Sequence, residues 1–385
     1  MEYCAVDLFA GAGGMSQGLT SSGINVVAAY ESWDAAVDTY NANFTTHAAT
    51  RQNLADEEDS IKKISEHSPD IIVGGPPCQD FSSAGTQIEG TRASLTVSYA
   101  TIVARVQPQC FVMENVPNAR KSKAYGEAQE IFKTAGYGLT ELVLDASFFG
   151  VPQRRKRLVV IGILHGDDGI ARNAIEKQES FLPVTVRQRY PEFPVEYYYR
   201  HPRSYARRAV FSIDEPAPTV RGSNRPKPSN YTPHLKDATT SADLRALTYQ
   251  ERALLQTFPK DFDWKSHSKT DIEQMIGNAV PIEMARRIGE ALKLILSGES
   301  EKRQSFGEWL RTDKKDTDAS ARDVVSRLRR AAIMTSKTDQ NELDEDDILR
   351  AAEEEGMKPA VLSQVLRARN LWQEYIESQS EAFAD

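Results

Sequence analysis

The sequence is poor in cysteine and lacks any long apolar run. Its 385 residues include only three cysteines, Cys4, Cys78 and Cys110. Three scattered cysteines are too few for a disulfide framework or a zinc site, so we expect a reducing cytoplasm and no metal centre. No apolar stretch approaches the roughly 20 residues that a membrane-spanning helix needs. We therefore expect no membrane association.

Positive charge is also scarce overall, but it is concentrated in one segment. The net charge of −8 alone argues weakly against nucleic acid as a ligand. Residues 186–236, however, contain ten Arg or Lys and four Asp or Glu, a local balance of +6. A basic face on an acidic chain is what a polyanion-binding site needs. Composition alone is equally consistent with a solvated surface loop.

The pattern along the chain predicts three parts. Short apolar strands alternate with helical stretches over residues 1–165, which predicts an α/β domain with a largely parallel sheet covered on both faces. An amphipathic helix between Pro281 and Gly298 is expected to pack back on it, so this domain comprises 1–165 plus 270–298. Residues 166–269 are rich in Pro, Arg and Tyr and predict a smaller irregular domain. Residues 299–385 are charged and helical, which predicts an accessory extension.

A glycine-rich turn follows the first predicted strand, Cys4–Phe9. The sequence Phe9-Ala10-Gly11-Ala12-Gly13-Gly14 precedes a helix, and the next strand ends at Glu31. Glycines permit a tight turn and close approach to a ligand, and an acid at that strand end typically accepts hydrogen bonds from ribose hydroxyls. The turn fits NAD, FAD or S-adenosylmethionine, or a tight turn without a ligand. Its spacing departs from G-x-G-x-x-G, which disfavours a dinucleotide.

A second loop carries an isolated thiol. The strand Ile71–Val73 runs into Gly-Gly-Pro-Pro-Cys78, and ligands of open α/β sheets bind outside the carboxyl ends of such strands. Cys4 and Cys110 lie in strand-like runs and fit the usual buried role of cysteine, whereas Cys78 does not. Glu114 directly follows the predicted strand Cys110–Met113 and is expected to face the same cleft as Cys78. The run Gln153–Arg157 abuts another strand, so at least one of its arginines should point inward.

Six motifs in this order resemble the cytosine-5 DNA methyltransferases of bacterial restriction–modification type. The resemblance covers about residues 3–296, and the matching motifs are DLFAGAGG (Asp7–Gly14), Glu31, GGPPCQDFS (Gly74–Ser82), ENV (Glu114–Val116), QRRKR (Gln153–Arg157) and QMIGNAVP (Gln274–Pro281). It implies a Rossmann-like catalytic domain that uses S-adenosylmethionine, with residues 166–269 as the target-recognition domain. It further implies double-stranded DNA as substrate, a bacterial cytoplasm, and a cognate restriction endonuclease as a functional partner.

The resemblance also assigns residue roles. Cys78 would add to cytosine C6, Glu114 would contact and protonate N3, and Arg155 and Arg157 would complete the catalytic set, the second holding O2. The base must leave the duplex for this chemistry. The implied cofactor residues are Phe9, Ala10, Gly11, Gly13, Gly14, Glu31, Ser32, Asn53, Leu54, Pro77, Leu95, Asn278 and Val280. Two of them depart from the family pattern. Asn53 occupies a position where the family usually has an aspartate. Ser32 occupies a position where the family often has an apolar or aromatic residue beside the adenine.

The expected DNA contacts lie in two places. Gln79 and Ser82 flank the nucleophile, and the recognition segment is expected to supply Arg207, Arg208, Arg221 and Arg225. Because arginine pairs bidentately with guanine, Arg221 and Arg225 suggest a guanine in the target.

Three other functions are weighed against this one. A tRNA cytosine methyltransferase would lack the long basic segment, and a catalytically silent DNA-binding regulator would not need Cys78 and Glu114. A nicotinamide oxidoreductase leaves Cys78 unexplained.

Overall fold

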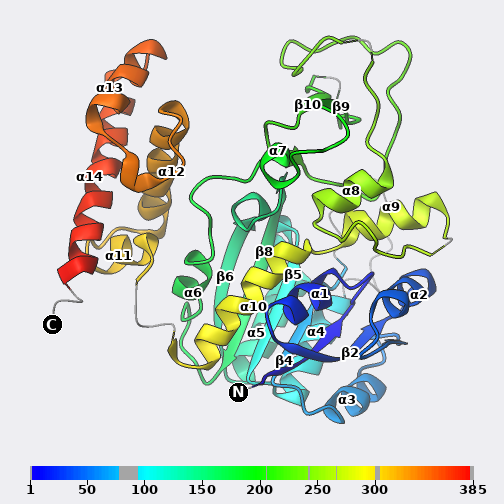
Figure 1. Ribbon diagram of the computed structural model, residues 1–385. Helices are drawn as coiled ribbons and strands as arrows, with labels where there is room; N and C mark the ends of the chain where they lie inside the picture. Colours follow the sequence, from blue (N-terminus) through cyan, green and yellow to red (C-terminus); the bar gives the residue numbers. More distant parts are fainter. Residues whose placement is uncertain are drawn as a thin grey trace. The chain divides into compact units, whose positions relative to one another are not determined.

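A seven-stranded sheet forms the centre of the first of two units (Figure 1). The computed structural model describes residues 2–77, 94–204, 206–241, 243–265, 267–299 and 304–381. The first unit is Met1–Ile170 with Pro183–Glu290, and the second is Ala171–Leu182 with Ala291–Asp385. Cys78, Gln79 and Ser82 lie outside the described residues.

The strand order is β3-β2-β1-β4-β5-β8-β6. The strands are β1 (Cys4–Leu8), β2 (Asn25–Glu31), β3 (Ala49–Arg51), β4 (Ile71–Gly74), β5 (Cys110–Asn115), β6 (Tyr137–Asp145) and β8 (Lys156–Leu164). All pairings from β3 to β5 are parallel, as the alternating pattern predicted, but β8 runs antiparallel to both of its neighbours. The order reverses between β1 and β4, and such a switch point is where open α/β sheets bind ligands.

Helices cover both faces of the sheet (Figure 1). One face carries α3 (Glu57–Ser65), α4 (Ser94–Val106) and α5 (Lys123–Thr134), whose apolar side chains share one core with alternate strand residues. The other face carries α1 (Gly14–Ser21) and the first half of α10 (Ile282–Leu296). A further helix, α2, spans Asp34–Asn43. A Cβ on Gly18 of α1 would stand 2.4 Å from the Ala285 Cβ, so these two helices approach unusually closely. The first half of the late helix thus packs against α1 of the first unit, whereas its residues from Ala291 onward group with the second unit.

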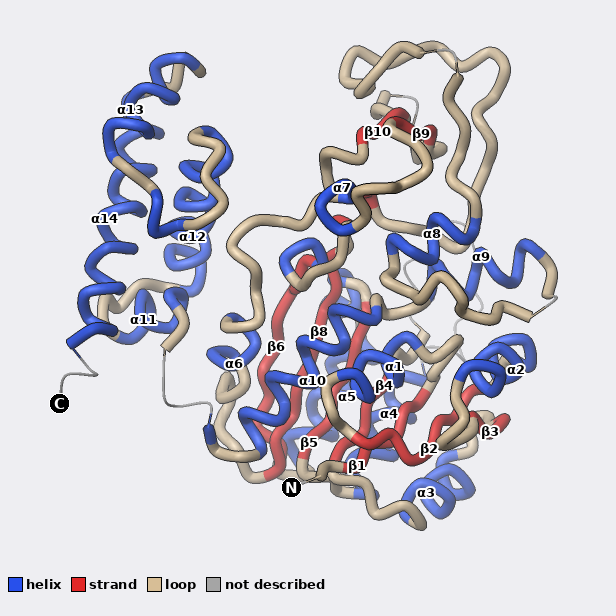
Figure 2. The backbone as a smooth tube through the Cα atoms, in the orientation of Figure 1, coloured by secondary structure: helices blue, strands red, loops and turns tan. Residues whose placement is uncertain are grey.

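Loops dominate residues 183–265, as their composition predicted (Figure 2). The elements of this region and its flanks are α7 (Val186–Arg189), β9 (Tyr197–Tyr199), β10 (Val210–Ser212), β11 (Ala217–Pro218), α8 (Tyr249–Leu255) and α9 (Lys269–Asn278). An aromatic and aliphatic cluster that includes Phe211, Phe258 and Trp264 gives the region a core. The short strand β11 pairs with β7 (Gln153–Arg154), which attaches the region to the segment before β8.

The second unit is helical and has a separate core. It contains α6 (Arg172–Glu176), α11 (Phe306–Thr312), α12 (Asp318–Met334), α13 (Glu345–Glu354) and α14 (Pro359–Glu381). Phe306, Trp309, Trp372 and Tyr375 form an aromatic cluster among these helices. Within the part of the chain described, no helix combines the length and apolar character needed to cross a bilayer.

Candidate active site and DNA-binding surface

One cavity of about 410 Å³ opens at the switch point between β1 and β4. It brings together most of the residues predicted for the cofactor and for catalysis. The predicted residues that line it are Phe9, Ala10, Gly11, Gly14, Glu31, Ser32, Asn53, Leu54, Pro77, Leu95, Glu114, Arg155, Arg157, Asn278 and Val280. Gly13 is an exception: it is absent from the lining, and a Cβ there would meet the Phe44 ring at 2.4 Å.

The glycine turn is shaped by backbone conformations that favour glycine. Gly11 and Gly13 have φ of +55° and +90°, in the left-handed region. A Cβ on Gly14 would lie 2.3 Å from the Val280 carbonyl oxygen, so only glycine lets α1 meet the late motif there. Phe9 also has a positive φ, +57°, a costly conformation for an aromatic residue that tends to mark functional sites.

Glu31 ties this turn to the end of β2. One carboxylate oxygen accepts a hydrogen bond from the Gly11 backbone N–H at 2.9 Å, and the other accepts from Ser32 and Trp33 at 2.7 and 2.9 Å. The remaining lone pairs are available to ribose hydroxyls from the cavity side. An acidic ribose acceptor beside a glycine turn and apolar walls fits S-adenosylmethionine.

Replacing Glu31 with Ala is expected to weaken S-adenosylmethionine binding by about 1–3 kcal/mol, because a carboxylate acceptor is lost from both the turn and the ribose. Calorimetry on the purified variant measures this directly. Glu66→Ala, which removes an exposed carboxylate after α3, is the matched control. An affinity equal to that of the control would limit Glu31 to bracing the turn.

Asp7 and Asn115 line the same cavity and were not predicted. Asp7 is buried and accepts a 2.6 Å hydrogen bond from Ser16, and burial raises the pKa of its carboxyl to about 7. The Asn115 amide donates to the Pro76 carbonyl oxygen at 3.1 Å, which attaches the nucleophile loop to β5. The ENV motif contains Asn115, but its partner lies 39 residues away, and only the fold brings the two together.

Glu114 and Arg157 form an ion pair in the wall of this cavity. The Arg157 Nε atom lies 2.7 Å from a Glu114 carboxylate oxygen, and the two side chains are 13% and 10% exposed. A Cβ on Gly75 would lie 3.4 Å from the other Glu114 oxygen, so the end of β4 passes directly beside this carboxylate. Cys78 follows Gly75 by three residues.

Arg155, predicted as part of the catalytic set, lines the cavity but binds the backbone of other segments. Its side chain is fully buried, and its guanidinium donates to the carbonyl oxygens of Val220, Gly277 and Ala279 at 3.0–3.2 Å. Burial lowers the pKa of this guanidinium to about 9. The geometry is that of a positioning residue that joins three distant segments at the cavity wall.

A second cavity, of about 400 Å³, lies in the recognition region and is rich in arginine. Arg200, Arg203, Arg221, Arg225 and Arg252 line it. Burial lowers the pKa of the Arg221 guanidinium, and the positive charges of Arg203 and Arg207 lower it further. Such mutual repulsion among cations is relieved when a polyanion binds.

The acids of the recognition segment pair with two other arginines. Glu196 and Asp214 both bind Arg187, and Glu215 binds Arg208. Among the described residues, Arg203, Arg207, Arg221 and Arg225 have no carboxylate partner. Asp214 and Glu215 therefore do not neutralise Arg221 or Arg225.

Arg208 has partners within the recognition segment. It forms two hydrogen bonds with the Glu215 carboxylate, and its guanidinium lies 4.4 Å from the centre of the Phe211 ring. Arg208 thus stabilises the turn after β10 through an acid seven residues away, and its contact with DNA stays a prediction.

Comparison with known proteins agrees with the geometry. The sequence profile of the family described as C-5 cytosine-specific DNA methylase matches residues 3–192 and 170–294. The Type II methyltransferase M.HgiDI of Herpetosiphon aurantiacus is 47% identical over 294 residues, 76% of this chain and 94% of that protein. The chain belongs to the C-5 cytosine-specific DNA methylases. It is an S-adenosylmethionine-dependent DNA (cytosine-5-)-methyltransferase.

Further relatives of this methyltransferase match a similar share of the chain. The Type II methyltransferase M.HindV of Haemophilus influenzae is 45% identical over 306 residues, 78% of this chain and 99% of that protein. The solved structure of the S. pombe Dnmt2 methyltransferase is similar with a TM-score of 0.56 and 19% identity, over 78% of this chain and 99% of that one, which shows the shared fold. The family profile stops at residue 294.

Proposed function

We propose that this methyltransferase modifies a cytosine within one short sequence of double-stranded DNA, as the modification half of a restriction–modification pair. The observation that carries the proposal is the single cavity in which the Glu31 turn and the Glu114–Arg157 pair face one another. The cation cluster in the recognition region supports duplex DNA as the substrate. The names of the similar Type II methyltransferases support the pairing with a restriction endonuclease.

The proposed chemistry begins with the cytosine flipped into the cavity, since its C5 and C6 atoms are unreachable within a duplex. The Cys78 thiolate adds to C6, while Glu114 gives a proton to N3 and Arg157 holds O2. Addition makes C5 nucleophilic, which splits a difficult step into two easier ones. S-adenosylmethionine, when bound, supplies the methyl group. Loss of the C5 proton to a base, release of Cys78 from C6 as the thiolate and return of the N3 proton to the Glu114 carboxylate then restore the aromatic ring.

The cofactor would be held by residues on both sides of the switch point. Glu31 would accept hydrogen bonds from the ribose, and Phe9 and Leu54 would line the adenine side, with Trp33 in place of the expected neighbour at Ser32. Asn278 and Val280 would close the pocket from the late motif. Arg155 would act indirectly, by holding the Val220 and Gly277 segments in place.

Methyl transfer into a duplex oligonucleotide library and into transfer RNA tests the substrate class. Digestion to nucleosides should yield 5-methyldeoxycytidine from the duplex and no methylated cytidine from the RNA. Transfer to the RNA alone would contradict the proposal in favour of the tRNA enzyme class.

Replacing Arg221 or Arg225 with Ala tests sequence recognition. If they contact guanine, each substitution should reduce discrimination between cognate and random DNA by about 1–3 kcal/mol. If they contact only phosphates, binding to all sequences should weaken alike, and the salt dependence should fall by about one unit per contact. Binding measured at several salt concentrations separates the two outcomes. Lys236→Ala removes an exposed cation outside the cluster and is the control; no change relative to it would move the recognition surface elsewhere.

A further inference from the structure

The second unit contains a segment that belongs, in sequence, to the methyltransferase. Ala171–Leu182 follows β8 and falls within the predicted recognition domain, 166–269, yet it packs with the C-terminal helices, and the loop-rich residues 183–265 follow it. We propose that these helices act as a clamp on residues 171–182, and that this restraint on the chain leading into the recognition region favours DNA binding. This inference rests on the proposed action on duplex DNA.

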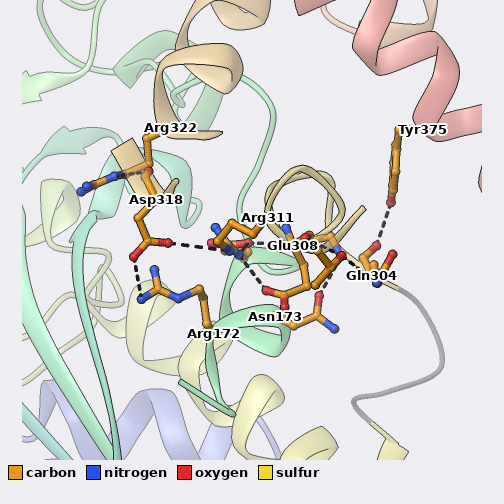
Figure 3. A network of polar contacts seen from close by, with 11 residues as sticks. Arg172, Asn173, Gln304, Glu308, Arg311, Asp318, Arg322 and Tyr375 are labelled. Atoms are coloured by element: carbon orange, nitrogen blue, oxygen red, sulfur yellow. Dashed lines mark hydrogen bonds and ion pairs between the residues drawn. The ribbon is translucent and has the colours of Figure 1, made fainter. Parts of the chain in front are cut away.

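Polar contacts hold the start of the segment. The Glu176 carboxylate accepts hydrogen bonds from Arg311 at 2.7 Å and from the Ser305 hydroxyl at 2.6 Å. The Asn173 side-chain oxygen accepts from the Ser305 backbone N–H at 2.7 Å. Figure 3 shows how Arg172, Asp318 and Arg311 meet beside these contacts. The N-cap residue and the last turn of α11 are thus joined to α6.

A second set of contacts holds the end of the segment. Arg329 of α12 donates to the Phe181 carbonyl oxygen at 3.0 Å and to the Glu179 carboxylate at 2.6 Å. The Phe181 and Leu182 side chains pack against the apolar core of the C-terminal helices. Only three residues separate Leu182 from α7, so the restrained segment ends just before the recognition region in the sequence.

The ion pairs Arg311–Glu176 and Arg329–Glu179 are mostly shielded from water. Arg311 and Glu176 are 14% and 22% exposed, and Arg329 and Glu179 are 19% and 26% exposed. Removing one partner of a charged hydrogen bond that is mostly shielded from water leaves the other poorly solvated. Both carboxylates come from the segment and both arginines from the C-terminal helices, so the attachment depends on both sides. An element restrained before binding loses less conformational freedom when it binds.

The family profile covers the clamped segment but not the helices that hold it. It includes residues 171–182 and ends at residue 294, before the helices that hold them. Those helices are therefore an addition that attaches to a segment of the common methyltransferase.

The test compares three full-length proteins: the unaltered chain, the double variant Glu176→Gln with Glu179→Gln, and Glu308→Gln. Glu308 binds the same Arg311 at 2.8 Å but lies on α11 itself, so Glu308→Gln makes the same chemical change without touching the segment. Three quantities are measured on each: amide hydrogen exchange over 172–182, KM and kcat on duplex DNA, and the affinity for S-adenosylmethionine.

In the double variant, exchange over 172–182 should rise by about tenfold or more, because the charged hydrogen bonds that restrain it are lost. KM for DNA should rise by roughly 3–10-fold, while kcat stays within about twofold and cofactor affinity is unchanged. Glu308→Gln should match the unaltered chain. Faster exchange with an unchanged KM would overturn the contribution to DNA binding, and unchanged exchange would overturn the clamp. If the double variant does not fold, Glu179→Gln alone is judged by the same criteria. An unaltered chain that does not act on duplex DNA would instead refute the proposed function, and the exchange experiment still tests the clamp.

Discussion

Substitution of Cys78 by Ser is expected to reduce methyl transfer by at least about 10³-fold while duplex DNA binding persists. The reason is that a hydroxyl remains protonated near neutral pH and is a far weaker nucleophile than a thiolate. Single-turnover transfer of labelled methyl groups measures the loss, and a gel-shift titration measures binding. A duplex with 5-fluorocytosine at the target should trap the unaltered protein as a denaturation-resistant adduct, because fluorine cannot leave C5 as a proton does.

Cys4→Ser is the matched control for this experiment. Cys4 lies at the start of β1, and burial raises the pKa of its thiol, as it does for the fully buried Cys110. Neither is therefore suited to act as a thiolate. Full activity of Cys78→Ser, or an adduct that forms without Cys78, would refute covalent catalysis by this residue.

The second large effect is expected at Glu114. Glu114→Gln keeps the shape of the side chain and a hydrogen-bonding group opposite Arg157, but it cannot give a proton to N3. A general acid typically contributes a factor of about 10²–10⁴, so kcat should fall by that amount. Because the Glu31 turn is untouched, S-adenosylmethionine affinity should stay within about twofold.

Rapid-quench kinetics and calorimetry test these two expectations for Glu114→Gln. Glu130→Gln, which changes an exposed carboxylate on α5, should behave as the unaltered protein. A kcat for Glu114→Gln within a few-fold of this control would show that N3 receives its proton from another group.

The cofactor side of the site was predictable because its determinants are local. The strand, the glycine turn and the helix of residues 4–21 follow one another without interruption, and Glu31 ends the next strand. Their sequence spacing therefore determines their placement around the end of β1. The departure from the family at Ser32 could not be judged from the sequence: both Ser32 and the aromatic residue Trp33, one position later, line the cavity.

The roles of individual arginines could not be predicted, because they depend on distant partners. Arg155 and Arg157 lie two residues apart in the same QRRKR motif. The carbonyl oxygens that bind Arg155 lie 65 to 124 residues away, whereas Arg157 meets Glu114 across β5 and β8. Arg208 and Arg221 likewise share a basic segment, but Glu215 captures only Arg208. Residue type and spacing identify a group of cations; the tertiary fold decides which of them remain available.

The strand directions show the same limit. Alternating strands and helices predicted a parallel sheet, and from β3 to β5 the sheet is parallel. The reversal of β8 depends on the path of the chain after α5, where β6 and β8 form an antiparallel pair at the edge of the sheet. No single-residue pattern marks that turn.

The central claim is that the chain methylates carbon 5 of cytosine at one short sequence in duplex DNA. Bisulfite sequencing of DNA from cells that express it tests this claim most directly, with cells that express Cys78→Ser as the baseline. The account predicts cytosines protected from conversion at a fixed position of a single recurring sequence, and none above background in the baseline cells. Protection scattered without regard to sequence, or equal in both cell lines, would contradict it.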